Sequence, residues 1–210
     1  MRRATRTIAK LFGVIAGIAG LEHGVFEILQ GNVRPEGLMI ASMGPPCVPE
    51  KVWNACEPAV TVIPSLLLAG ILTVIVGFAV LVWAAAFVQR RKGGLVLILL
   101  SIVLLLVGGG VFPPLIGIIG GVAGIKINAP VERQSKDRPG SFLRFLAKLW
   151  PWLLVIFLVW ILGQWIVGYF FNEFLQKNAY LSLLLIIILL PLSLLTAYAY
   201  DVFDRTRVEG

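Results

Sequence analysis

The amino-acid sequence predicts an all-α fold: a polytopic transmembrane helical bundle with about six membrane segments. Of its 210 residues, 59% are hydrophobic and only 14% are charged, which is more apolar than a water-soluble domain of this size can enclose. Uncharged stretches longer than the ~20 residues of a spanning helix cover 58–89, 93–125, 149–172 and 178–200. Most of the 18 Lys and Arg lie between such stretches, a distribution that orients membrane proteins.

The first membrane segment is predicted at 11–29, directly after a basic N-terminus. A basic start followed by small residues is also typical of a cleaved signal peptide. A stripe of glycines at helical spacing favours an uncleaved helix, because small residues let membrane helices pack closely. The stripe consists of Gly13, Gly17, Gly20, Gly24 and Gly31. A second stripe at 117–124 is expected to pack in the same way.

Three ionisable residues interrupt this first helix: Glu22, His23 and Glu27. Ionisable groups at membrane depth are costly and are candidates for a functional site. His23 is the only histidine, and histidine can carry a proton near neutral pH. One hypothesis is a path for a proton or a cation; the other is a structural pairing between His23 and a carboxylate or carbonyl. A single histidine does not predict a metal site, and no cofactor is predicted.

The loop 31–57 contains both cysteines, Cys47 and Cys56. If the N-terminus faces the cytoplasm, this loop is outside, where an oxidising environment favours a disulfide between them. The alternative, a thiol oxidoreductase, would need a C-x-x-C motif or a second cysteine pair. Neither is present in the sequence.

The run 93–125 is predicted to turn back as a hairpin broken by glycine and proline. As one helix it would be about 50 Å long, against a hydrocarbon core of ~30 Å. Its hinge consists of Gly108, Gly109, Gly110, Pro113 and Pro114. Prolines disfavour helix at and before their own position, so the second arm is expected at 115–127, short or re-entrant. The alternative is a single kinked crossing, which would place the basic residues of 126–148 outside, against the charge bias.

These elements divide the chain into three parts. Residues 1–128 form an N-terminal membrane region, 129–141 a basic cytoplasmic linker, and 142–210 a C-terminal two-helix hairpin. The stretch 141–152 begins the next spanning helix or lies on the membrane surface, and Gln164 is expected to hydrogen-bond to a neighbouring helix. This arrangement predicts a plasma-membrane protein with both termini in the cytoplasm.

The sequence contains no catalytic motif: there is no G-x-S-x-G elbow and no phosphate-binding loop. The first functional hypothesis is therefore a non-catalytic accessory or assembly component, with the lipid bilayer and a membrane-protein partner or a second copy as its contacts. The alternative is a small channel or transporter for a proton, cation or small solute, using Glu22, His23, Glu27 and the broken hairpin. A lipid-modifying enzyme has no candidate residues. Nucleic acid is not expected, since the net charge of +7 is concentrated in the connecting segments.

Overall fold

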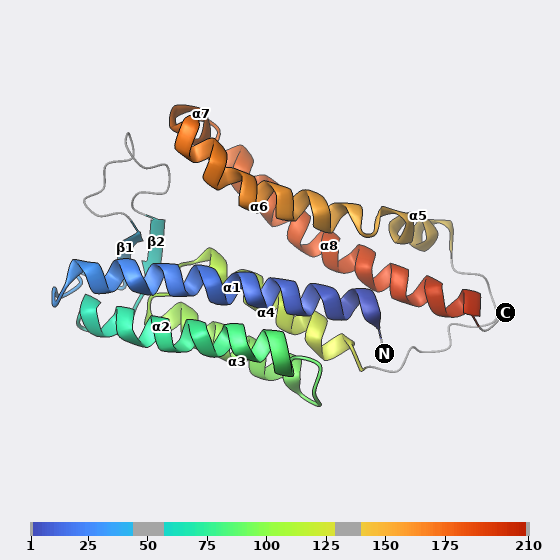
Figure 1. Cartoon of the computed structure of the whole chain (residues 1–210), viewed down its shortest axis with the longest axis horizontal. Helices are drawn as coiled ribbons and strands as arrows, with labels where there is room; N and C mark the ends of the chain where they lie inside the picture. Colours follow the sequence, from blue (N-terminus) through green and yellow to red (C-terminus); the bar gives the residue numbers. More distant parts are fainter. Residues whose placement is uncertain (1, 44–56, 129–139, 209–210) are drawn as a thin grey trace.

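A computed structural model describes residues 2–43, 57–128 and 140–208 (Figure 1). Its helices are α1 (Arg3–Gln30), α2 (Leu66–Val82), a π-helical turn η1 (Trp83–Phe87), α3 (Gly93–Val107), α4 (Phe112–Lys126), α5 (Ser141–Leu149), α6 (Trp152–Phe170), α7 (Asn172–Lys177) and α8 (Ala179–Val208). Two short antiparallel strands, β1 (Met39–Met43) and β2 (Glu57–Val60), lie in the loop after α1. The predicted all-α class is confirmed.

Four helical stretches are long and apolar enough to cross a membrane: Arg3–Gln30, Leu66–Phe87, Ser141–Phe170 and Ala179–Asp204. Helices α3 and α4 contain 15 residues each, which gives about 22 Å at 1.5 Å per residue. This is shorter than the hydrocarbon core of ~30 Å. The predicted count of about six segments is therefore not confirmed, because the run 93–125 is divided into two short halves.

Helices α1 to α4 and the two strands form an N-terminal unit, residues 2–43 and 57–128, held together by glycines. A Cβ added at Gly17 would lie 2.6 Å from the Leu81 backbone nitrogen of α2, and one at Gly70 of α2 would lie 2.6 Å from that of Ile28. At Gly120 of α4 a Cβ would lie 3.2 Å from the backbone nitrogen of Gly13. Both predicted glycine stripes are thus in close helix contacts, as small residues allow, except for Gly31, which ends α1 and has no described atom within 4 Å of an added Cβ.

Helices α3 and α4 are antiparallel, so the chain does turn back. A Cβ added at Gly124 would lie 2.7 Å from the Cα of Gly94, at the start of α3. The turn uses positive backbone φ angles of 123° at Gly108 and 78° at Gly110, which only glycine adopts readily. The prediction that the prolines lie outside the second arm was wrong. Pro113 and Pro114 lie in the first turn of α4, where a proline is tolerated because first-turn amides have no intrahelical partner.

Helices α5 to α8 form a C-terminal unit, residues 140–208. The chain breaks between α5 and α6 at Trp150 and Pro151, so 141–149 is a separate helix, which packs against α8. Helix α8 also packs against α1 and α4 of the N-terminal unit. Almost all of the predicted linker 129–141 lies outside the described residues, as do Cys47 and Cys56, so their disulfide stays a prediction.

The two units are joined at one end by Asp201 of α8. Its buried carboxylate accepts hydrogen bonds from the backbone amides of Ala4 and Thr5, at 2.9 and 2.8 Å, and from the Thr5 hydroxyl at 2.7 Å. The first amides of a helix have no intrahelical partner and carry partial positive charge. Asp201 therefore caps α1 from the other unit. From this end the α6 to α8 hairpin diverges from α1, and α7 lies farthest from α1 (Figure 1).

Candidate functional site

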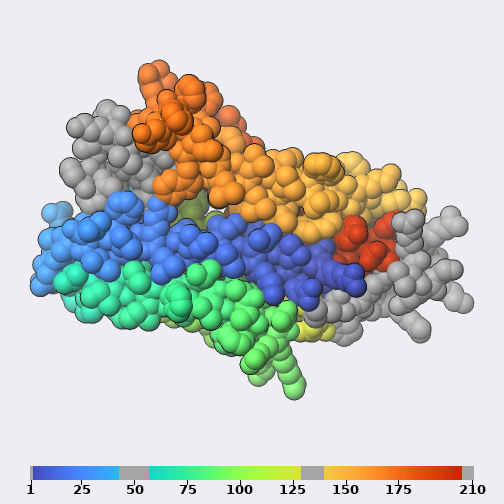
Figure 2. Space-filling model, viewed as in Figure 1, coloured from blue at the N-terminus to red at the C-terminus, as the bar shows by residue number. Residues whose placement is uncertain are grey.

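A cavity of about 500 Å³ lies between the two units, where they diverge. In the space-filling view a hollow separates α1 from the C-terminal unit, with α4 visible at its base (Figure 2). Residues of α1, β2 and α4 line one wall, and residues of α6, α7 and α8 line the other. Small-molecule sites are commonly cavities of about 300–1,000 Å³ at such boundaries. The cavity is therefore the candidate site.

Most of the cavity wall is apolar. Each helix presents branched or aromatic side chains to it, among them Ile15, Phe112, Ile116, Ile161, Leu183 and Ile186. Phe112 and Pro113 belong to the first turn of α4, immediately after the glycine turn. The first turn of the second hairpin arm thus contributes directly to the cavity wall.

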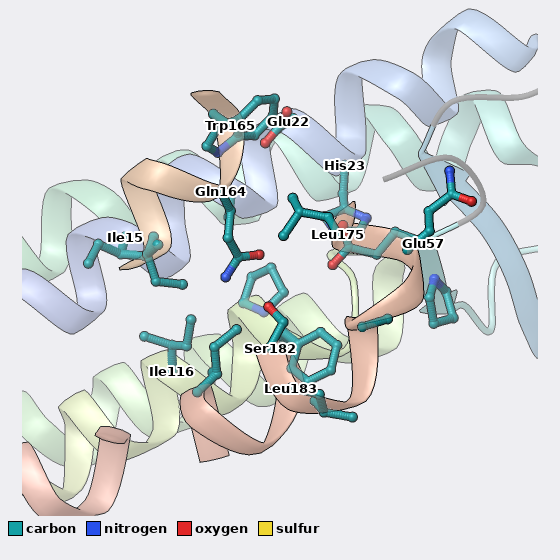
Figure 3. Close-up of a pocket in the computed structure, with 18 residues that line it drawn as sticks. Ile15, Glu22, His23, Glu57, Ile116, Gln164, Trp165, Leu175, Ser182 and Leu183 are labelled. Carbon is teal, nitrogen blue, oxygen red and sulfur yellow. The ribbon is translucent and has the colours of Figure 1, made fainter. Parts of the chain in front are cut away.

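The ionisable groups of the cavity are Glu22 and His23 of α1 and Glu57 of β2 (Figure 3). Its uncharged polar side chains include Gln164 of α6, Gln176 of α7 and Ser182 of α8. His23 Nε2 lies 4.0 Å from Glu57 Oε2, a distance beyond hydrogen bonding. Glu57 was missed by the sequence analysis. It lies in the loop before α2, and only the β1–β2 pairing, which matches Glu57 with Met43, brings that loop back to α1. No sequence pattern indicated this register.

Two buried nitrogen atoms of cavity-lining residues have no hydrogen-bond partner among the described residues: the donor Gln164 Nε2 and the ring nitrogen His23 Nδ1. Gln164 is 8% exposed and His23 1% exposed, so bulk water does not satisfy them. A buried unsatisfied polar group costs about 1–3 kcal/mol. The expected bond from Gln164 to a neighbouring helix is not made by its Nε2. Instead the amide points into the cavity (Figure 3), where a bound molecule could accept its hydrogen bond.

Glu57 is the ionisable group of the cavity that lies outside the helices. Burial and, to a smaller degree, the neighbouring Glu22 carboxylate raise the pKa of Glu57 to about 7. Both causes disfavour the charged form. Glu57 therefore gains or loses a proton near neutral pH, and a cation placed beside it would favour its ionised form.

Glu27 does not line the cavity, unlike the other two ionisable residues of α1. It is fully buried. The Ser42 hydroxyl donates to Glu27 Oε1 at 2.9 Å, and the Thr73 hydroxyl lies 3.4 Å from Oε2 and 3.0 Å from the Val107 carbonyl oxygen. Glu27 thus joins α1 to β1, α2 and the end of α3. Of the three predicted residues, Glu22 and His23 therefore line the cavity, whereas Glu27 lies in the interior and connects neighbouring elements.

The glycine turn packs directly against these polar groups. A Cβ added at Gly110 would lie 2.7 Å from His23 Cε1, and one at Gly108 would lie 2.7 Å from the Glu27 carboxyl carbon. Gly109 packs on Leu104, and Pro114 is buried. Two sets of residues that were predicted separately, the polar residues of α1 and the hinge, therefore form one region of the molecule.

The apolar helices indicate an α-helical membrane protein. Among the described residues, no three His, Cys, Asp or Glu side chains are grouped as metal ligands. No family model, curated protein or solved structure matches this chain.

Proposed function

We propose that this chain is a non-catalytic membrane protein that binds a small solute in the cavity between its two units and carries it across the membrane. The observation behind the proposal is the cavity of about 500 Å³, into which the amide of Gln164 points with an unsatisfied donor. An apolar chamber with a few converging polar groups is the usual form of a small-molecule site. The described residues give no catalytic arrangement that would favour an enzyme.

The position of the cavity supports transport. Membrane transporters commonly bind their substrates between two helical units, beside helices that are broken at membrane depth. Here α4 begins at the cavity, after the turn at 108–111, and the units are joined at the far end by Asp201. A change in the angle between the units would open or close the cavity while that end stays closed.

The proposed solute path differs from the one suggested by the sequence. It includes Glu22, His23, Glu57 and Gln164, and it leaves out Glu27, which is enclosed by Ser42, Thr73 and Gly108. We propose the plasma membrane as its location, with both termini in the cytoplasm, because the basic residues are concentrated near the N-terminus, at 90–92 and in 126–148.

An accessory role is the second candidate. The observation that favours it is the large uncovered apolar surface of α6 and α8, with Val159 66% exposed and Ile187 55% exposed. Lipid can cover such a surface, and so can a helix of a membrane partner or of a second copy. An accessory protein would bind that partner and would move no solute by itself.

The test is solute uptake by the purified protein in liposomes, using a radiolabelled panel of small amines, alcohols and carboxylates. The variant Ala19→Trp places a large ring at the cavity wall. The matched control is Ile18→Trp at the adjacent, outward-facing position of α1, which is 55% exposed. We expect uptake of at least one solute class that is lost in Ala19→Trp and retained in Ile18→Trp. Absence of uptake by the intact protein, with a stoichiometric partner recovered in mild detergent, would favour the accessory role.

A further inference from the structure

The ionisable groups of the cavity give it acidic character. Glu22 and Glu57 line it, and Glu22 is close enough to Glu57 to act on it electrostatically. Among the described lining residues there is no Lys or Arg, and His23 is the one group that can carry a positive charge. Even a protonated His23 would neutralise only one of the two carboxylates. A buried carboxylate without a counter-charge is costly. A cation bound in the cavity would offset this cost.

The rest of the wall is suited to a hydrocarbon body. Ile116, Ile161 and Ile186 come from three different helices around the same space. The rings of Phe112 and Trp165 also line the cavity, and aromatic faces attract organic cations as well as apolar groups. A small hydrated metal ion would leave this apolar surface unused. An organic cation would use both kinds of wall.

The unsatisfied polar atoms provide a second, independent indication of a ligand. The amide of Gln164 points into the cavity and its Nε2 has no partner, and Nδ1 of His23 also has none. Gln164 lies on α6, whereas Glu22 and Glu57 belong to the opposite wall. A ligand that satisfies all of these groups carries a positive charge and a hydrogen-bond acceptor at separate positions.

We propose that the solute is an amphipathic organic ammonium compound. Its ammonium group lies at Glu22 and Glu57, its apolar body lies against α4, α6 and α8, and an oxygen acceptor on it takes the hydrogen bond from Gln164. This inference rests on the proposed function and specifies its substrate class. The same chemistry is found in a free amine and in the headgroup of an aminophospholipid.

Binding of an ammonium compound is expected to depend on pH through Glu57. The titratable groups that face it are Glu22 and His23 of α1; α6, α7 and α8 contribute the uncharged side chains of Gln164, Gln176 and Ser182 to the same cavity. Because the pKa of Glu57 is raised to about 7, the cavity gains negative charge as the pH rises from 6 to 8. Affinity for a permanent or protonated cation should increase over that range.

The experiment measures saturable binding of octylamine to the full chain in phosphatidylcholine nanodiscs, with octanol as the neutral probe of equal length. We expect octylamine to bind at least tenfold more tightly than octanol, and the advantage to disappear in the double variant Glu22→Gln/Glu57→Gln. The matched control is Glu173→Gln, which removes an exposed carboxylate of α7 that pairs with Lys177 and does not line the cavity. This control should keep the advantage.

The possible results distinguish a lipid headgroup from a free amine as the ligand. They also distinguish failure of the ammonium assignment from failure of the proposed function. If phosphatidylethanolamine in the nanodiscs competes with octylamine, the source is a lipid headgroup; if it does not, the source is a free amine. If octylamine and octanol bind equally and Ala19→Trp abolishes both, the cavity binds solutes but the ammonium assignment is wrong. If neither probe binds saturably, the proposed function fails as well.

Discussion

The N-terminal and C-terminal units are both apolar and helical, yet they are held together differently. In the N-terminal unit, glycines bring α1 into backbone contact with α2 and α4, and buried polar groups such as Glu27 and Thr73 join its elements. In the C-terminal unit, α6 exposes much of its side-chain surface, with Tyr169 82% exposed. The cavity lies where the closely packed unit meets the open one. Its three ionisable groups, Glu22, His23 and Glu57, all belong to the closely packed unit, which can hold them in fixed positions.

The largest expected effect comes from filling a glycine contact in the N-terminal unit. In Gly70→Ala the new Cβ would lie 2.6 Å from the Ile28 backbone nitrogen and 2.6 Å from the Gly24 carbonyl oxygen. Because backbone atoms cannot move aside easily, we expect a loss of about 3 kcal/mol of stability, at the upper end for overpacking. The measurement is thermal unfolding in detergent.

The matched control for this prediction is Gly163→Ala in the C-terminal unit. Apart from the neighbouring backbone of α6, no atom of the described residues lies within 4 Å of a Cβ added at Gly163, and alanine favours helix over glycine by about 1 kcal/mol. This variant should be as stable as the original chain or more stable. Equal destabilisation of the two variants would contradict the difference in packing between the units.

A smaller effect is expected from removing the contact that joins the units. Asp201→Ala leaves the amides of Ala4 and Thr5 without their partner, and loss of a helix cap costs about 2 kcal/mol at most. Asp204→Ala removes an exposed carboxylate one turn further along α8 and should change the unfolding temperature little. If Asp201→Ala were as stable as Asp204→Ala, Asp201 would not be what holds the two units together.

A further prediction is a pH dependence of stability that originates at Glu57. Its pKa is about 7 in the folded chain against 4.5 as the ordinary value, so the folded state binds the proton more tightly than the unfolded state. Between these two pH values the folded chain therefore loses stability as the pH rises. Glu57→Gln should remove this component of the unfolding profile measured from pH 4.5 to 8. A profile identical to that of the original chain would contradict the assignment.

The sequence was sufficient for features that depend on local patterns. Uncharged runs predicted the helices, and the distribution of basic residues, with the glycines and prolines of 108–114, predicted that the chain turns back. The proline interpretation failed because the rule against proline in helices does not apply to the first turn. The length of an uncharged run also did not show whether it forms one membrane-spanning helix, because the run 93–125 is divided into the two short helices α3 and α4.

The candidate site was predicted only in part, because its contacts join distant residues. Glu22 and His23 were noted as costly groups on one helix, but Glu57 meets them through the register of a short sheet. Gln164 comes from the other unit, whose position depends on contacts such as that of Asp201 with Thr5, 196 residues apart. Local spacing contains no information about such pairings, and Glu27 could be assigned to the interior only when its partners were known.

The most direct measurement is whether the cavity contains water in a membrane. A single cysteine is placed at Ser182, which lines the cavity, or at Leu184, which is 52% exposed on the outer side of α8, with Cys47 and Cys56 replaced by serine. Each variant in liposomes is treated with a water-soluble maleimide. We expect Ser182→Cys to react and octylamine to slow the reaction, whereas Leu184→Cys in lipid stays unreactive. Equal reactivity at both positions, or none at Ser182→Cys, would contradict a solute-binding cavity between the units.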